Sequence, residues 1–166
     1  MSMPIIPPEL LPFTRKAFPC DIQTLKDNLR QDDMNDVRRL CGRDPEEALR
    51  RGCLRSSPCV TFFMPGKPEQ PVGMGGVVPP GIAWVLFHKD FLKTKEERNV
   101  FLKACPLVRN WFLSQSVGGF MHNVTLRENK RIRRWLRWLG AQELPDTGRG
   151  PIHFYFTKNK EDNRHV

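Results

Sequence analysis

The sequence predicts a mixed α/β domain in which a central sheet is flanked by helices. Segments with the 3.6-residue period of helices alternate along the chain with segments typical of strands, as in layered α/β domains. The 166 residues are 39% hydrophobic and 27% charged, a balance typical of a globular chain with one core. The apolar run Ile82–Phe87 has the length of a central strand covered on both faces.

The chain divides into a proline-rich arm, one domain and a polar tail, at residues 1–20, 21–157 and 158–166. Prolines in the arm favour an extended conformation. The arm lacks the basic start and apolar core of a signal peptide, and no apolar run in the sequence is long enough to span a bilayer. We therefore expect no membrane partner.

The domain begins with a weakly alternating segment, residues 21–29, which we interpret as an opening strand. A helix is expected at residues 32–40, with Gly42 just past its end. A second helix should begin at Asp44, because Asp-Pro-Glu-Glu supplies a cap, a first-turn proline and two acids near the positive helix end. It should run to about Cys53.

Three strands in a meander are expected next, at residues 59–64, 72–78 and 82–87, separated by turn segments rich in Pro and Gly. Glycines interrupt the second of these strands, which indicates bulges or the close approach of another chain segment.

The second half of the domain starts with the longest helix, which Thr94-Lys-Glu-Glu97 opens as a capping box. Pro106 predicts a kink or a restart near the middle of this helix. A strand at residues 120–126, a basic helix at 129–139 and a last strand at 152–157 complete the domain.

The closing strand–helix–glycine–strand unit resembles that of the GNAT fold of acyl-CoA-dependent N-acyltransferases. Many members of that family have an Asn, then apolar residues at helical spacing, then a Gly. The matching positions here are Asn129, Ile132, Trp135, Leu136 and Gly140. The run Leu29-Arg30-Gln-Asp-Asp33 resembles the Arg-x-x-Asp run that leads into the family's first helix. The resemblance implies a GNAT-type fold, with a mixed central sheet flanked by helices.

The sequence is also similar to a GNAT-like family encoded by tailed phages, in particular short-tailed podoviruses. The similar segments are Trp84-Val-Leu86, Asn123-Val-Thr-Leu-Arg-Glu-Asn129 and Ile132-Arg-Arg-Trp-Leu-Arg-Trp-Leu-Gly140. Some members of that family are internal virion or head-morphogenesis proteins. The similarity implies phage structural proteins as partners and a location in the virion or the host cytoplasm.

The GNAT resemblance implies acetyl-CoA as the candidate cofactor. Family members hold its pyrophosphate on a glycine-rich loop at the start of the long helix. Residues 88–98 contain no glycine, Thr94 caps the free N–H groups, and Glu96 and Glu97 add negative charge. We therefore expect the usual cofactor cradle to be lost. The remaining candidate cofactor-binding residues are Leu86, Lys93, Lys95, Asn123 and Asn129.

The usual acid and base of the family are also missing. Its general acid is often a tyrosine, where this chain has Leu136, and its base is often a glutamate, but residues 82–87 contain no carboxylate. His88 and His122, expected near the mouth between splayed strands, are the candidate catalytic residues; the alternative is that each is a satisfied histidine at a strand edge. Five cysteines without a CxxC pair predict no metal site.

Basic residues dominate the charge of the chain, which is +9 overall. The candidate partner-binding residues on the basic helix are Arg131, Arg133, Arg134 and Arg137. Such a surface suits an acidic protein surface or, without base specificity, nucleic acid. The alternative is a solvated outer face whose arginine stems cover the sheet.

Three functions remain open at this point. The first is a phage protein with a GNAT fold that acts in virion structure or assembly and has a degenerate acyltransferase site. The second is an active acetyl-CoA-dependent N-acetyltransferase that modifies a host or phage protein. The third is a module associated with nucleic acid.

Overall fold

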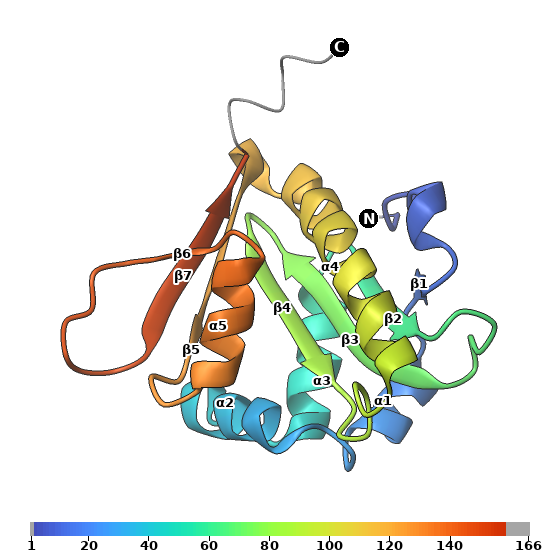
Figure 1. The fold of residues 1–166 in the computed structure, drawn as a ribbon, viewed down its shortest axis with the longest axis horizontal. Helices are drawn as coiled ribbons and strands as arrows, with labels where there is room; N and C mark the ends of the chain where they lie inside the picture. Colours follow the sequence, from blue (N-terminus) through green and yellow to red (C-terminus); the bar gives the residue numbers. More distant parts are fainter. Residues whose placement is uncertain (1, 159–166) are drawn as a thin grey trace.

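A seven-stranded mixed sheet forms the centre of the molecule, in the order β1-β2-β3-β4-β5-β7-β6 (Figure 1). The computed structural model describes residues 2–158. The strands are β1 (Thr14–Lys16), β2 (Cys59–Phe63), β3 (Pro71–Val78), β4 (Ile82–Phe87), β5 (Phe120–Thr125), β6 (Gln142–Glu143) and β7 (Ile152–Thr157). Only β4 and β5 pair in parallel; the other neighbouring strands in the described residues are antiparallel.

Helices cover both faces of the sheet, which confirms the predicted mixed α/β class (Figure 1). One face carries α1 (Pro19–Leu25), α2 (Gln31–Cys41) and α3 (Pro45–Arg55), and the other carries α4 (Lys95–Gln115) and α5 (Lys130–Trp138). Short 3-10 turns lie at Pro8–Leu10 and Val117–Gly119. Each helical layer buries its own apolar cluster against the sheet, and the cluster beneath α4 and α5 is the larger.

Local capping signals place the starts of α3, α4 and α5 where the sequence predicts them. Asp44 caps α3 by accepting a hydrogen bond from the Glu47 N–H at 3.0 Å. Thr94 and Glu97 form the expected capping box of α4, which then runs as one helix through Pro106. Asn129 caps α5 by accepting from the Ile132 N–H. These contacts need only neighbouring residues, so the sequence alone reveals them.

The predicted opening strand at residues 21–29 is wrong, because α1 occupies most of that segment. Ile22 and Leu25 are one helical turn apart and both are buried. Asp21 accepts a hydrogen bond from the Phe18 N–H, which fixes the start of the helix. Of the predicted strand, Leu29 alone makes an isolated bridge, to His88.

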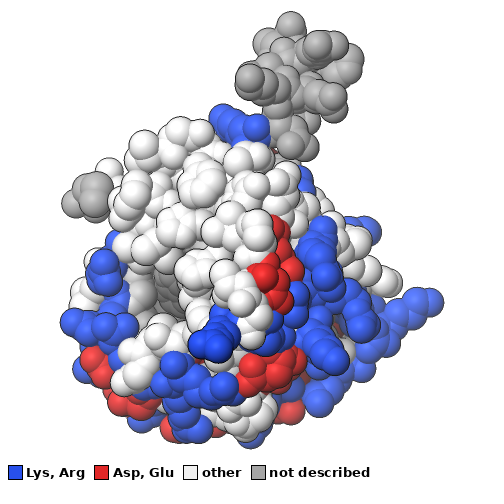
Figure 2. Space-filling view, turned by 90° about the vertical axis from the view of Figure 1, so that its left-hand side faces the viewer, with Lys and Arg blue, Asp and Glu red and all other residues white. Residues whose placement is uncertain are grey.

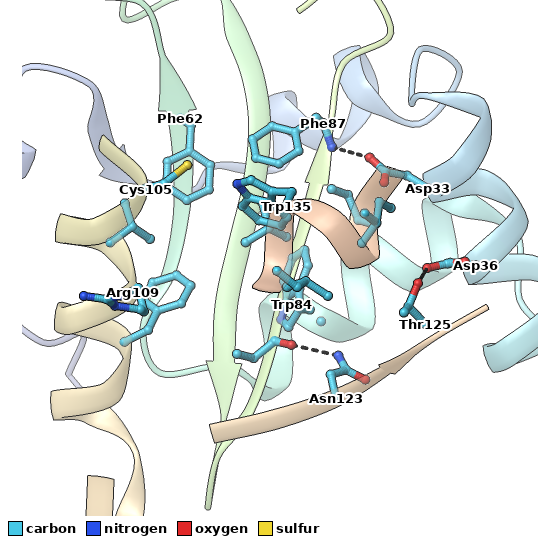
Figure 3. A pocket seen from close by; sticks show the side chains of 18 of the residues that line it. Asp33, Asp36, Phe62, Trp84, Phe87, Cys105, Arg109, Asn123, Thr125 and Trp135 are labelled. Atoms are coloured by element: carbon cyan, nitrogen blue, oxygen red, sulfur yellow. Dashed lines mark hydrogen bonds between the residues drawn. The ribbon is translucent and has the colours of Figure 1, made fainter. Parts of the chain in front are cut away.

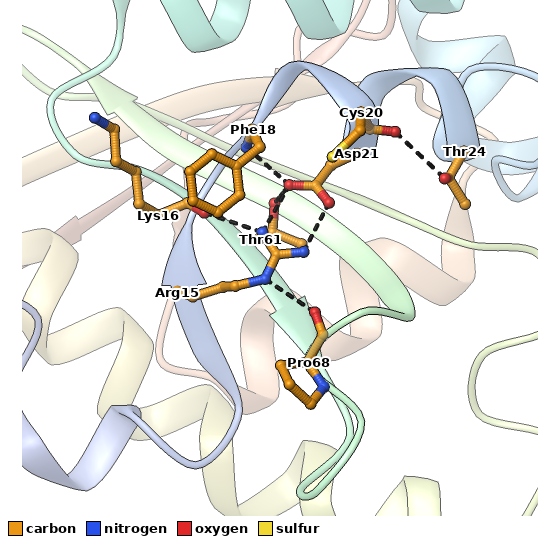
Figure 4. Close-up of polar contacts among 8 residues, drawn as sticks. All are labelled: Arg15, Lys16, Phe18, Cys20, Asp21, Thr24, Thr61 and Pro68. Carbon is orange, nitrogen blue, oxygen red and sulfur yellow. Dashed lines mark hydrogen bonds and ion pairs between the residues drawn. The ribbon is translucent and has the colours of Figure 1, made fainter.

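Part of the proline-rich arm packs on the domain. Residues Thr14–Lys16 form the edge strand β1, which pairs with β2, and Leu10 is fully buried in the cluster beneath α4. The Arg15 guanidinium donates two hydrogen bonds of 2.8 Å to Asp21, and the Thr61 hydroxyl donates a third, of 2.7 Å (Figure 4). This network ties the arm to α1 and β2. Of the tail predicted at 158–166, residues 159–166 lie outside the described residues.

Replacing Asp21 with asparagine is expected to lower the free energy of unfolding by about 3 kcal/mol at pH 7, because it leaves the Arg15 charge without its partner. Burial alone would raise the pKa of Asp21, but hydrogen bonds from Arg15, the Phe18 N–H and Thr61 outweigh it and lower the pKa. The carboxylate therefore stabilises the fold above the ordinary aspartate pKa of about 3.9, and this contribution is lost as pH falls through the lower folded value.

Urea unfolding at pH 7 and pH 3 measures this effect. The stability difference between the wild type and Asp21→Asn should shrink at the lower pH. Asp27→Asn is the control, since the Asp27 side chain is 79% exposed. An equal pH dependence in the wild type and the Asp21 variant would contradict the assignment.

Candidate functional site

The sheet opens between β4 and β5, its two parallel neighbours. Their register contains a single residue pair, Ile82 with His122, next to a 2.9 Å hydrogen bond from the His122 N–H to the Gly81 carbonyl. Beyond this pair the strands diverge (Figure 1). The Asn123 side-chain amide donates to the Ala83 carbonyl at 2.7 Å across the start of the gap (Figure 3). The rest of the gap has no backbone ladder and forms a cleft.

A cavity of about 360 Å³ occupies this cleft and reaches both helical layers. Its walls are mainly apolar and aromatic. On the side of α4 and α5 they include Phe101, Cys105, Phe112 and Trp135, and on the side of α2 and α3 they include Val37, Leu40, Gly52 and Trp84. A cavity of this size and composition is typical of a small-molecule site.

Two aspartates of α2 hold the diverging strands in place (Figure 3). Asp33 accepts a 2.8 Å hydrogen bond from the Phe87 N–H at the end of β4. Asp36 accepts from the Thr125 hydroxyl at 2.8 Å and from the Leu126 N–H at 3.3 Å, at the end of β5. The two aspartates lie one helical turn apart, so α2 bridges β4 and β5 where the sheet itself does not. We call this pair the α2 brace.

Burial raises the pKa of both aspartates of the α2 brace, and their hydrogen bonds oppose it. Asp33 also accepts two 3.2 Å hydrogen bonds from Arg30, whose guanidinium lies 4.8 Å from the centre of the Phe87 ring. Both oxygens of each carboxylate are engaged by protein donors. These groups therefore shape the cleft, and neither has an oxygen left without a protein donor.

One buried donor in the cavity wall has only a weak partner. The Trp135 ring lies against Phe101 and Phe87, with ring centres 5.7 and 6.3 Å away. Its Nε1–H is buried and makes no hydrogen bond to oxygen or nitrogen within the described residues. The neighbouring Cys105 thiol, whose pKa burial raises to about 12, is its one contact of this kind and a weak acceptor. This position therefore favours a ligand that supplies a stronger acceptor atom.

The predicted cofactor-binding residues are divided between two places. Leu86 and Asn123 line the cavity. Lys93 and Lys95 lie at the start of α4, and Asn129 caps α5; none of these three is among the cavity-lining residues. Their binding roles stay predictions.

The two predicted catalytic histidines are not brought together at the cavity, and neither is among its lining residues. The His88 ring accepts a hydrogen bond from the Asp90 N–H at 3.1 Å. The His122 ring packs 5.6 Å from Phe120. Their catalytic roles stay predictions. Leu136, where the GNAT resemblance implies a tyrosine, is buried in the cluster beneath α5.

The arginines of α5 fall into two groups. Arg133 donates two 2.9 Å hydrogen bonds to Glu143 of β6 and is held within the domain. Arg131, Arg134 and Arg137 are exposed and make no ion pair within residues 2–158. In the view of Figure 2, Lys and Arg side chains are densest on the right-hand side and also lie along the lower part of the molecule.

The described residues contain no group of His, Cys, Asp and Glu side chains that could hold a metal ion. Within the same part of the chain, no helix has both the length and the apolar character needed to cross a bilayer.

The sequence matches no protein-family model, and it matches no curated protein. The structure is similar to solved acetyltransferases. An acetyltransferase from Agrobacterium tumefaciens has a TM-score of 0.63 and 10% identity, over 95% of this chain and 96% of that one. A GNAT-superfamily phosphinothricin acetyltransferase from Sinorhizobium meliloti, in complex with AcCoA, has a TM-score of 0.56 and 14% identity, over 87% of this chain and 86% of that one.

A putative acetyltransferase from Salmonella typhimurium, solved with its cofactor acetyl-CoA, has a TM-score of 0.53 and 11% identity, over 89% of this chain and 94% of that one. At these identities the similarity concerns the fold. It confirms the predicted GNAT-type fold.

Proposed function

We propose that the chain is an acyl-CoA-dependent N-acyltransferase that binds the acyl-pantetheine arm of its cofactor in the cleft between β4 and β5. The observation that carries the proposal is the buried Trp135 Nε1–H, whose neighbour is the weakly accepting Cys105 thiol, in the wall of an apolar cavity within a GNAT-type fold. Two solved proteins of similar fold contain acetyl-CoA, which supports the same cofactor class here.

The cleft offers the complementary groups that an acyl-pantetheine arm needs. The arm is largely apolar and carries amide and thioester carbonyls, so Trp135 Nε1 can donate to one of them. Between Ala83 and Phe87, the edge of β4 that faces the cleft has no strand partner, and the backbone groups there suit amides, whereas those of Phe87 are engaged by Asp33 and Arg30. Lys93 and Lys95, at the start of α4, are the candidates for the phosphates. When bound, an acyl-CoA supplies the acyl group as an activated thioester.

The chain offers little general acid–base help for the transfer. Both carboxylates in the cavity wall belong to the α2 brace, and Leu136 has no proton to donate. Positioned acids and bases contribute about 10²–10⁴-fold to rate. We therefore expect turnover slower by about that factor than in an enzyme of this fold with a dedicated acid and base.

Calorimetric titration with acetyl-CoA is expected to give a dissociation constant in the micromolar range, about 8 kcal/mol of binding free energy. Trp135→Phe removes the donor and keeps an aromatic ring, so it should weaken binding by about 2- to 10-fold, the worth of one neutral hydrogen bond. Trp138→Phe is the matched control, because Trp138 is on the same helix and 54% exposed. A folded wild type that shows no binding contradicts the proposal.

A role in virion structure or assembly is the second candidate, with the acyltransferase site reduced or lost. It is favoured by the exposed arginines Arg131, Arg134 and Arg137, together with the resemblance of three short sequence segments to a GNAT-like family of tailed phages. The partner would be an acidic surface of a phage structural protein, in the virion or the host cytoplasm. Mass spectrometry of purified particles and assembly intermediates of the encoding phage tests this role, and absence from both contradicts it.

Nucleic acid is the alternative partner of the same surface. If this is the partner, binding of the protein to a DNA duplex should weaken steeply as the salt concentration rises, because phosphate contacts release counterions. Binding that is insensitive to salt would contradict such a contact.

A further inference from the structure

The cavity extends into a chamber between α2 and α3, on the side of the sheet opposite α4 and α5. On α3, Ala48, Arg51, Gly52 and Arg55 line it, which is one face of the helix by their spacing. On α2, Asp33, Asp36, Val37 and Leu40 line it with the same spacing. These two facing helix surfaces define what we call the α2–α3 chamber.

The floor of the chamber is Trp84 of β4, which is held rigidly. Its indole N–H donates to the Ser56 hydroxyl at 2.8 Å. Gly52 lets α3 approach the ring closely, because a Cβ at that position would lie 2.7 Å from Trp84 Cζ2. The floor therefore presents a fixed aromatic surface to anything that enters.

Arginines surround the chamber and outnumber their acidic partners. Arg43, Arg51 and Arg55 all line it. Arg43 and Arg51 share the Glu47 carboxylate, with nitrogen–oxygen distances of 3.8 and 3.7 Å. Arg55 has no ion pair within residues 2–158. The aspartates of the α2 brace are engaged by Arg30, Thr125 and backbone donors.

On the opposite face of α3, Arg50 and Lys26 share the Glu46 carboxylate, at 2.6 and 3.2 Å. The chamber side differs because Arg55 adds a cation that has no ion pair within residues 2–158. The chamber also opens to solvent, because the Arg51 side chain in its wall is 53% exposed. Figure 2 shows a hollow in the face that it draws, with blue side chains near part of its rim.

We propose that the α2–α3 chamber binds the anionic group of the acceptor, a small amine that also carries a carboxylate or a phosphate. Guanidinium forks match both groups in geometry and charge. The proposal rests on the proposed function, because the chamber continues into the gap between β4 and β5. An acceptor held by its anionic end in the chamber thus has its amine facing the cleft that receives the acyl-CoA.

Binding of matched pairs of probes tests the chamber without requiring turnover. The pairs are L-glutamate with L-glutamine and O-phospho-L-serine with L-serine, titrated by calorimetry and by the NMR signal of the Trp84 indole N–H. One acidic probe is expected to bind at least about 10-fold more tightly than its neutral partner and to shift the Trp84 signal. The double variant Arg51→Gln/Arg55→Gln should lose that preference, whereas Arg50→Gln, on the opposite face, should keep it.

Equal affinity for the acidic and neutral probes overturns the proposal, and so does a preference that survives the double variant. Binding of an acidic tetrapeptide but of neither free acid overturns the assignment to a small acceptor. Thermal unfolding of each variant checks that it is folded.

The acetyl-CoA titration separates this inference from the proposed function. Acetyl-CoA binding without an acid preference removes the chamber proposal and leaves the cofactor site. An acid preference without acetyl-CoA binding keeps the anion site and removes the acyltransferase.

Discussion

Replacing Asp33 with alanine is expected to lower the free energy of unfolding by about 3–5 kcal/mol, since it breaks a buried ion pair from one side. The Asp33 side chain is 3% exposed, and the variant leaves the Arg30 charge and the Phe87 N–H without their acceptor. Urea unfolding at pH 7 measures the loss. Because α2 would no longer hold the end of β4, acetyl-CoA affinity should fall as well.

Asp32→Ala is the matched control for this experiment. Asp32 precedes Asp33 in the first turn of α2 and makes no side-chain hydrogen bond within the described residues. Its carboxylate contributes through the helix dipole alone, so we expect a loss below about 1 kcal/mol. Similar losses in the two variants would show that the brace contributes nothing beyond helix charge.

The variant Gly81→Ala is expected to destabilise the fold by about 3 kcal/mol or more, at the upper end of overpacking effects. A Cβ at Gly81 would lie 2.3 Å from the Phe120 carbonyl oxygen, which is backbone and cannot swing aside. This contact lies where β4 and β5 still touch, next to the Ile82–His122 pair. To accept the methyl group, the two halves of the sheet must separate at their junction.

Thermal and urea unfolding of Gly81→Ala should be compared with Gly148→Ala. Gly148 has open space around its missing Cβ but a φ of +80°, so its replacement reports backbone strain alone. That strain is worth about 1–2 kcal/mol. A smaller loss at Gly81 than at Gly148 would be inconsistent with a tight junction.

Local interactions explain why most of the fold could be predicted from the sequence. The caps at Asp44, Thr94 and Asn129 depend on groups three residues apart, and strands such as β2 and β4 show their apolar character directly. The prediction of a strand at residues 21–29 is wrong because the helix signal there consists of only one capping carboxylate and two apolar residues. The edge strand β1 is not predicted from the sequence, because its three residues become a strand only by pairing with β2.

The site was less predictable, because tertiary contacts create it. A strand pattern does not reveal where a ladder stops, and the brace contacts join residues 54 and 89 positions apart. The run Arg30-Gln-Asp-Asp33 was a usable signal, since it marked one aspartate of the brace, but its role required the end of β4. The sequence signal for the chamber was weaker. It consisted of the i, i+4 spacing of Arg51 and Arg55, which places both on one face of a helix beside Gly52.

The α2 brace sets the width of the cleft and also forms part of its wall. Asp33 and Asp36 line the cavity, and their hydrogen bonds fix the distance from α2 to the ends of β4 and β5. In a related chain, glutamate at either position would lengthen one of these links by about one methylene. Divergence in the size of the bound ligand can therefore begin on a helix, through the reach of two side chains that keep the same chemistry.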